Sequence, residues 1–287
     1  MRYIEFEKVA HTVEQLCISA AYELSEDVLA ALKKSTGNES NPTAAQVLNQ
    51  LIKNAQIAAA DKIPLCQDTG LAVVFVELGS QVIIRPPAGK NQETLTEAIN
   101  AGVAAGYEKG YLRKSVVAEP LKERKNTGTN TPAVTHITVV PGETLRLTVM
   151  LKGGGCENKS RFKMFNPTAS KEQILDWIVA VTAQAGADAC PPFIVGVGIG
   201  GSFELSCILS KKALCRNLDN RNPDLFYADF ENELLSRINT LGIGPMGLGG
   251  ATTALGCMVE VAPCHIASLP VAANIECHSH RHKSAII

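Results

Sequence analysis

Apolar residues recur at helical spacing through the first 60 residues. Between residues 11 and 23, Val13, Leu16, Cys17 and Ala20 fall on one face of a helix. The same spacing predicts two further helices, over residues 26–34 and 42–60. Each predicted start carries a residue type that caps helices: Thr12 (in a capping box with Gln15), Ser25 and Asn41. The pattern therefore predicts a helical N-terminal part over about residues 1–62.

From residue 71 onwards the pattern changes to short apolar runs rich in β-branched residues. These runs predict strands over residues 71–78, 81–85, 136–140, 145–152, 193–199, 253–261 and 268–275. Turn residues separate two pairs of strands, which predicts β-hairpins at Gly79-Ser80 and at residues 141–144. Helical spacing returns over residues 91–108, 170–187, 202–214 and 226–241. The sequence predicts an α/β fold, with helices packed around mixed or antiparallel sheet segments in a single domain over residues 1–287.

The composition narrows the class of protein. Of the 287 residues, 46% are hydrophobic and 19% are charged, which supplies enough apolar side chains for a large core. The formal net charge is −1 and no long run of like charge occurs, so nothing predicts binding to nucleic acid or to a membrane surface. No apolar stretch approaches the ~20 residues that span a bilayer, and the N-terminus lacks a signal-peptide pattern. We expect a cytoplasmic protein.

The chain contains nine cysteines, at positions 17, 66, 156, 190, 207, 215, 257, 264 and 277. An odd number in a long cytoplasmic chain favours metal, redox or core roles over disulfides. Three lie inside helical or strand patterns, which indicates core positions: Cys17, Cys207 and Cys257. Cys66, Cys190 and Cys277 instead follow the ends of regular elements, at breaks rich in Pro, Gly or His. Three such thiols could converge on a metal cluster, although their spacing alone does not require it.

One loop carries an unusual density of reactive side chains. Pro64 to Gly70, with the sequence Pro-Leu-Cys-Gln-Asp-Thr-Gly, separates a predicted helix from a predicted strand. It holds a thiol, an amide, a carboxylate and a hydroxyl, which can bind metal, hold a polar ligand and move protons. Taken alone, the loop is better explained as a polar turn with a core cysteine, because cysteine is among the most buried residue types.

A glycine pattern offers an alternative function. Gly196-x-Gly198-x-x-Gly201 matches the dinucleotide-binding fingerprint between a predicted strand and a predicted helix, and Asp219 follows at a suitable distance for a ribose contact. However, no second strand follows the helix directly, because residues 215–224 are loop-like. The other interpretation is that the glycines let a buried strand pass close to other backbone or to a prosthetic group.

The C-terminal segment offers a second alternative. Cys277, His278, His280 and His282 are dense in zinc-ligand types. No Cys-x-x-Cys pair occurs in the chain, and a terminal stretch rich in His, Arg and Lys is often only solvated. A zinc site is therefore the weaker interpretation of this segment.

The order of several motifs resembles the class I (iron–sulfur) fumarase and tartrate dehydratase family over nearly the whole chain. The motifs are Cys66-Gln67-Asp68-Thr69-Gly70, Asn126-Thr127-Gly128, Lys152-Gly153-Gly154-Gly155, Ala189-Cys190-Pro191-Pro192, and His265 twelve residues before Cys277. The resemblance implies that Cys66, Cys190 and Cys277 are the three ligands of a [4Fe–4S] cluster. Because such clusters normally take four protein ligands, three cysteines leave one iron open.

The resemblance also implies roles around the open iron. Gln67 and Asp68 match residues beside the substrate, and Arg113 falls in the stretch of a carboxylate-binding arginine, across a length difference. Gly154 and Gly155, in the glycine run, match a backbone contact to the substrate.

Two further positions concern proton handling and iron ligation. His265 matches an active-site histidine, so that Asp68 and His265 are the in-chain candidates for moving protons. Cys156 lies where single-chain fumarases usually have serine, and we do not predict it to be a ligand.

The expected activity is that of a hydro-lyase. The resemblance implies reversible dehydration of a 2-hydroxy dicarboxylate, either malate to fumarate or tartrate to oxaloacetate. Single-chain members of the family continue through a further domain, whereas this sequence stops about ten residues after Cys277. The resemblance is therefore to the α subunit of the two-subunit type, with a separate β subunit and an α2β2 assembly expected.

Overall fold

The computed structural model describes residues 1–90 and 93–287, and these residues form two compact units. The first unit comprises Met1–Leu24, Ala55–Gly154 and Arg281–Ile287. The second unit comprises Ser25–Asn54 and Gly155–His280. No helix within the described ranges is both long enough and apolar enough to cross a membrane. The α/β class predicted from the sequence is confirmed, and the single-domain organisation stays a prediction.

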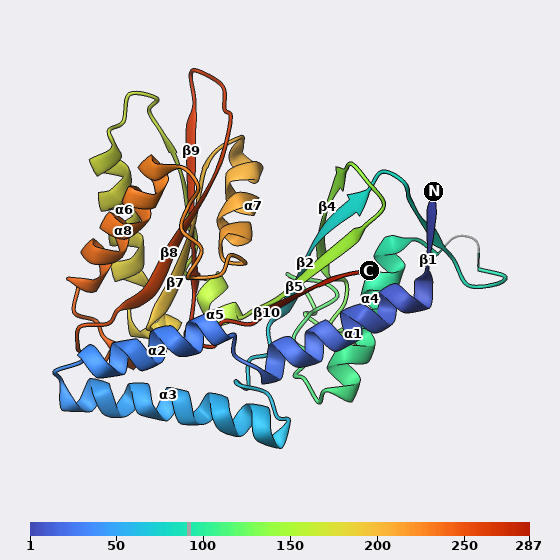
Figure 1. Ribbon diagram of the computed structural model, residues 1–287, viewed down its shortest axis with the longest axis horizontal. Helices are drawn as coiled ribbons and strands as arrows, with labels where there is room; N and C mark the ends of the chain where they lie inside the picture. Colours follow the sequence, from blue (N-terminus) through green and yellow to red (C-terminus); the bar gives the residue numbers. More distant parts are fainter. Residues whose placement is uncertain (91–92) are drawn as a thin grey trace. The chain divides into compact units, whose positions relative to one another are not determined.

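The first unit is built on a mixed four-stranded sheet with the strand order β10-β5-β2-β4. Its strands are β2 (Leu71–Gly79), β4 (Val134–Val140), β5 (Leu145–Lys152) and β10 (His282–Ile286). A short parallel pair, β1 (Arg2–Glu5) and β3 (Val82–Arg85), forms a separate sheet. The helices α1 (Phe6–Tyr22) and α4 (Leu95–Lys109) pack against each other (Figure 1).

Alternation of side chains along the strands builds the core of the first unit. Ala72, Val74 and Val76 of β2 are buried in one apolar cluster with Leu147 and Val149 of β5. Because successive residues in a strand point to opposite faces, these positions all face the same side of the sheet. Residues of α1 and α4 complete this cluster. The two helices therefore cover one face of this sheet, whose strand β2 directly follows the loop at residues 64–70.

Both predicted hairpins are wrong, because their strands pair with partners other than their neighbours in the sequence. β2 lies between β4 and β5, parallel to the former and antiparallel to the latter. The turn at residues 141–144 closes around the end of β2: Gly79 N–H donates to Thr144 O, and Ser80 N–H donates to Val140 O, at 2.9 and 2.8 Å. β3 pairs with the N-terminal β1 instead of with β2. Local turn residues mark where the chain bends, but the choice of strand partner is non-local.

The second unit is built on a four-stranded sheet with the order β6-β9-β7-β8. Its strands are β6 (Arg161–Phe165), β7 (Phe193–Gly200), β8 (Ala254–Ala262) and β9 (Leu269–Glu276). Helices α6 (Lys171–Ala185) and α8 (Leu225–Asn239) cover one face and α7 (Phe203–Ala213) covers the other (Figure 1). The unit also contains α2 (Glu26–Asn38) and the 3₁₀ turns η1 (Ala187–Ala189) and η2 (Pro245–Gly247). Two helices have residues in both units: α3 (Pro42–Asp61) and α5 (Gly154–Glu157).

Helix starts were predicted with mixed success. Asn41 caps α3, with its Oδ1 accepting from Thr43 N–H at 3.0 Å. Ser170 forms a capping box with Gln173 at the start of α6. The prediction for Thr12 is wrong, because α1 already begins at Phe6 and the Thr12 hydroxyl donates to Lys8 O inside the helix. The predicted start of a helix at Asn91 lies outside the described residues.

The glycines of the dinucleotide-like pattern lie under a helix. Gly196 and Gly198 belong to β7, where a Cβ would approach Ser210 O to 2.1 Å and Ser206 O to 2.0 Å, respectively. Both oxygens are backbone atoms of α7, so the glycines allow this helix to pack tightly on the strand. β8 follows α8 and pairs in parallel with β7, so a β–α–β connection does exist. The geometry nonetheless favours the packing interpretation, because two of the three glycines lie within the strand.

This packing gives a stability prediction. Gly198→Ala is expected to lower the free energy of unfolding by ~1–3 kcal/mol, since the new methyl group meets backbone that can yield only if α7 moves. Gly37→Ala is the matched control, because a Cβ at Gly37 of α2 meets nothing within 4 Å. The control should leave stability unchanged or raise it by up to ~1 kcal/mol. Denaturant unfolding of both variants checks this; equal stabilities would contradict the proposed close packing.

Candidate active site and metal centre

The first unit holds the loop at residues 64–70 in a fixed conformation from several sides. Leu65 N–H donates to Ala21 O at 2.9 Å, which ties the start of the loop to α1. The Thr69 hydroxyl donates to Arg113 O at 2.9 Å. Tyr107 of α4 is fully buried, and its hydroxyl lies 2.9 Å from the carbonyl oxygens of both Thr69 and Gly70, to which it donates. Burial raises the pKa of the Tyr107 hydroxyl, which keeps it a donor.

Asp68 links this loop to the glycine run after β5. Its Oδ1 accepts from Gly70 N–H at 3.0 Å, and its Oδ2 accepts from Gly154 N–H at 2.8 Å. The structure thus brings together Asp68 and Gly154, two residues for which the family resemblance implies a place beside the substrate. Arg113, another of the predicted substrate residues, has its backbone against the same loop, and its side chain is exposed. Gln67 is exposed and Cys66 half-buried, so both remain accessible beside Asp68.

Arg281 is a buried residue of this region that the sequence analysis did not identify. It is 1% exposed, and its Nη1 donates to the carbonyl oxygen of Asp68. A Cβ on Gly153 would lie 3.2 Å from Arg281 Nη2 and 3.3 Å from Asp68 Oδ2. Gly153 therefore leaves room for both groups to approach the glycine run. The only signal in the sequence was a charged residue among histidines, a pattern that resembles a solvated tail.

An asparagine completes the support of the loop. Asn130 is fully buried, and its Nδ2 donates to Gly70 O at 3.1 Å. Its Oδ1 accepts from the N–H groups of Ser115 and Val116, at 2.7 and 3.2 Å. The irregular segment at residues 111–132 is thereby anchored to the Asp68 loop through its own polar side chain.

The second unit brings two of the predicted cluster ligands to one end of its sheet. Cys190 precedes β7, and Cys277 follows β9. The two strands are antiparallel, with Ile194 opposite Glu276, so the start of one meets the end of the other. His278 Nδ1 lies 3.0 Å from Cys190 O. Cys66, the third predicted ligand, belongs to the first unit.

The same end of the second unit contains two further donor groups. Cys156 Sγ, Cys277 Sγ and a Glu276 carboxylate oxygen all lie within 4.8 Å of one another, and all three residues are buried. Cys156 Sγ also donates to Ala189 O at 3.4 Å, next to Cys190. Over the described part of the chain this is the one group of three such donors close enough to hold a metal ion, and it includes no histidine of the C-terminal segment. Of the zinc set predicted for that segment, only Cys277 belongs to this group.

His265 lies away from these cysteines. It is exposed in the loop before β9, whereas Cys277 follows the last residue of that strand. Eight residues of extended strand span roughly 26 Å. The structure therefore does not bring His265 together with Cys190 and Cys277 of its own chain.

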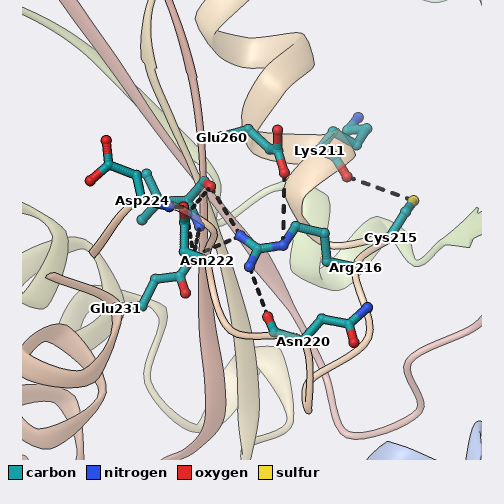
Figure 2. Close-up of polar contacts among 9 residues, drawn as sticks. Lys211, Cys215, Arg216, Asn220, Asn222, Asp224, Glu231 and Glu260 are labelled. Carbon is teal, nitrogen blue, oxygen red and sulfur yellow. Dashed lines mark hydrogen bonds and ion pairs between the residues drawn. The ribbon is translucent and has the colours of Figure 1, made fainter. Parts of the chain in front are cut away.

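Residues 216–224, which carry Asp219, form a loop fixed to β8 and α8 (Figure 2). Arg216 Nη1 donates to Glu231 Oε1 at 2.7 Å and to Val259 O at 3.1 Å, while Nη2 donates to Asn220 O at 2.9 Å. The backbone N–H of Asp219 donates to Asn217 Oδ1 at 2.8 Å, which holds this residue within the loop. The interactions of Arg216 within the protein explain this loop without a nucleotide.

Other cysteines have the character of core residues. Cys17 is fully buried, and burial raises the pKa of its thiol to about 12. Burial likewise raises the pKa of the Cys257 thiol in β8. These two core predictions are confirmed, and Cys207 of α7 is half-buried with a thiol pKa raised mainly by burial. A raised pKa disfavours the thiolate that binds metal.

Comparison with known proteins supplies the family. Residues 10–286 match the model of the fumarate hydratase (fumerase) family. A protein of Methanocaldococcus jannaschii with a provisional name, L(+)-tartrate dehydratase subunit alpha, is 38% identical over 280 residues, which cover 96% of this chain and 95% of that protein. An Escherichia coli protein named L(+)-tartrate dehydratase subunit alpha is 30% identical over 282 residues, covering 98% of this chain and 91% of that one. The resemblance drawn from the motifs is thus confirmed, and the chain belongs to the fumarate hydratase (fumerase) family.

Proposed function

We propose that this chain is the cluster-bearing α subunit of a hydro-lyase that reversibly dehydrates a 2-hydroxy dicarboxylate. The observation that carries the proposal is the hydrogen bond from Gly154 N–H to the Asp68 carboxylate, which joins the Asp68 loop to the glycine run. It occurs in a chain that belongs to the fumarate hydratase family. Tartrate is the first substrate to test, because the relatives named above are tartrate dehydratase subunits. Malate is the second, given the family to which the chain belongs.

The donor chemistry fits an iron–sulfur cluster. Cys190 and Cys277 lie at one end of the second unit, and Cys66 stands in a half-buried loop of the first. Thiolates are the ligands that iron–sulfur clusters take. We propose these three cysteines as the ligands of a [4Fe–4S] cluster with one open iron. When bound, such a cluster supplies a Lewis acid for the hydroxyl and carboxylate of the substrate.

The chain's own residues would bind and orient the substrate and move a proton. Gln67 and the exposed Arg113 offer an amide and a guanidinium, and a guanidinium binds a carboxylate in bidentate fashion. The backbone of Gly154 and Gly155 would contact the substrate. Asp68, oriented by two backbone N–H groups, is the candidate for proton transfer. His265 lies at the end of β9 opposite Cys277, so we propose no role for it beside the Cys190 and Cys277 of its own chain.

A β subunit is proposed as the partner. Proteins that align with this chain almost from end to end are named as alpha subunits. A site of this type needs groups that bind both carboxylates of the substrate. We propose that the β subunit supplies the groups that bind the second carboxylate. We propose an α2β2 assembly.

The test is a substrate panel on the co-expressed complex. The chain is purified without oxygen, alone and with its β subunit, and both samples are assayed for iron and for dehydration of tartrate and malate. We expect a brown, oxygen-sensitive protein with about four irons per chain, active on a dicarboxylate only in the complex. Full turnover by the isolated chain would contradict the need for a partner. A colourless complex without iron, inactive on both acids, would overturn the proposed function.

A further inference from the structure

The second unit contains a thiol that the proposed cluster does not use. Cys156 begins the segment Cys-Glu-Asn-Lys-Ser directly after the glycine run, and it is 5% exposed. Its Sγ lies within 4.8 Å of both Cys277 Sγ and a carboxylate oxygen of Glu276. Glu276 is fully buried at the end of β9, and Cys277 is 7% exposed. Two thiols and one carboxylate therefore share a small, largely water-free volume.

We propose that Cys156, Glu276 and Cys277 form a binding site for a single divalent ion of the iron or zinc class. This goes beyond the proposed cluster function, because it assigns Cys156 and Glu276, and because all three donors belong to the second unit. Two thiolates and a carboxylate suit Zn²⁺ or Fe²⁺ and exclude hard ions such as Mg²⁺, which require oxygen ligands. The three donor atoms lie within 4.8 Å of one another, a range that includes the ~3.8 Å between two sulfurs that each lie ~2.3 Å from one tetrahedral ion.

The position of the site also follows from the fold. Three segments meet there: residues 154–157, the η1 turn with Cys190, and the end of β9. Cys156 Sγ donates to Ala189 O, which fixes the side chain toward the turn. Cys277 is shared with the proposed cluster, so the single ion and the cluster exclude one another. The single ion therefore binds only to a chain that lacks the cluster. Ion binding displaces the two thiol protons to solvent and holds Cys156 and Cys277 as thiolates.

Cobalt is the probe, because thiolate-bound Co²⁺ absorbs strongly and the bands scale with the number of thiolates. The full chain is freed of iron with a chelator, kept reduced without oxygen, and titrated with Co²⁺ alone. We expect one ion per chain and a charge-transfer band corresponding to two thiolates. Cys156→Ser should halve the band and weaken binding at least ~100-fold, more than the 10- to 100-fold typical of losing an outer-shell partner. Glu276→Gln should weaken binding while keeping the band.

Two matched cysteine variants decide the assignment. Cys66→Ser removes a proposed cluster ligand from the first unit, and Cys264→Ser removes an exposed thiol of the second unit; neither should change Co²⁺ binding. Unchanged binding by Cys156→Ser would overturn the proposal, as would an equal loss in Cys66→Ser. Melting of the metal-free variants shows whether they fold, and Cys156→Ala serves if the serine variant does not. Iron content after cluster reconstitution is a separate readout: Cys156→Ser should retain it, so this site and the proposed cluster can fail independently.

Discussion

Cys190→Ser is expected to abolish cluster retention and lower activity of the α–β complex at least ~10³-fold. Cys190 occupies a left-handed backbone conformation, with φ at 54°, and its carbonyl oxygen lies 3.0 Å from His278 Nδ1. Serine has nearly the same size and leaves these backbone features in place. What is lost is the thiolate, the donor that iron–sulfur clusters require. Removing a metal-based contribution of about 4 kcal/mol to the transition state accounts for the ~10³-fold loss.

The measurement is iron per chain after anaerobic purification, together with the rate of dehydration. Cys264→Ser is the control, because Cys264 is exposed in the loop before β9, away from Cys190. The control should keep full iron content and rate. A Cys190→Ser protein that holds as much iron as the control would show that Cys190 is not a ligand.

The elements that were predicted well from sequence are those set by local chemistry. β7 appeared as a continuous apolar run and is buried along its whole length. α6 begins at its capping box, because Ser170 and Gln173 satisfy the free backbone groups of the first turn between themselves. Strand order was predicted poorly, because β2 pairs with β4 and β5, which lie more than 50 residues further along the chain. β10 was missed because its residues are mostly polar and it lies at a sheet edge.

The sequence motifs of the site were predictable, but the buried residues that hold the site loop in place were not. The loop residues Cys66 to Gly70 stand out by their chemistry and by their resemblance to a family. Arg281 and Tyr107, which hold that loop, carry no such signal, because burial of a polar side chain depends on the tertiary fold. The nearness of Cys156 to Cys277 is of the same kind, since 120 residues separate them in the sequence.

Asp68→Asn is expected to lower the rate of the α–β complex by roughly 10²–10⁴-fold, the usual contribution of a positioned proton-transfer group. Each oxygen of the Asp68 carboxylate accepts from one backbone N–H, those of Gly70 and Gly154. An asparagine has one acceptor oxygen, so its amide group would face a second donor. The cost to folding should be ~1–3 kcal/mol. The loop should remain in place, because Arg281 donates to the backbone carbonyl of residue 68 and not to its side chain.

The loss of rate must be separated from the loss of structure. Iron per chain and the unfolding midpoint are measured beside the rate, and we expect iron content to stay at the wild-type level while the rate falls. Asp188→Asn is the matched control: Asp188 pairs with Lys159 at 2.9 Å, but its side chain is 80% exposed, so the pair contributes little. Activity of Asp68→Asn within tenfold of this control would remove Asp68 from proton transfer. Loss of iron along with activity would instead indicate that the carboxylate positions the loop that carries Cys66.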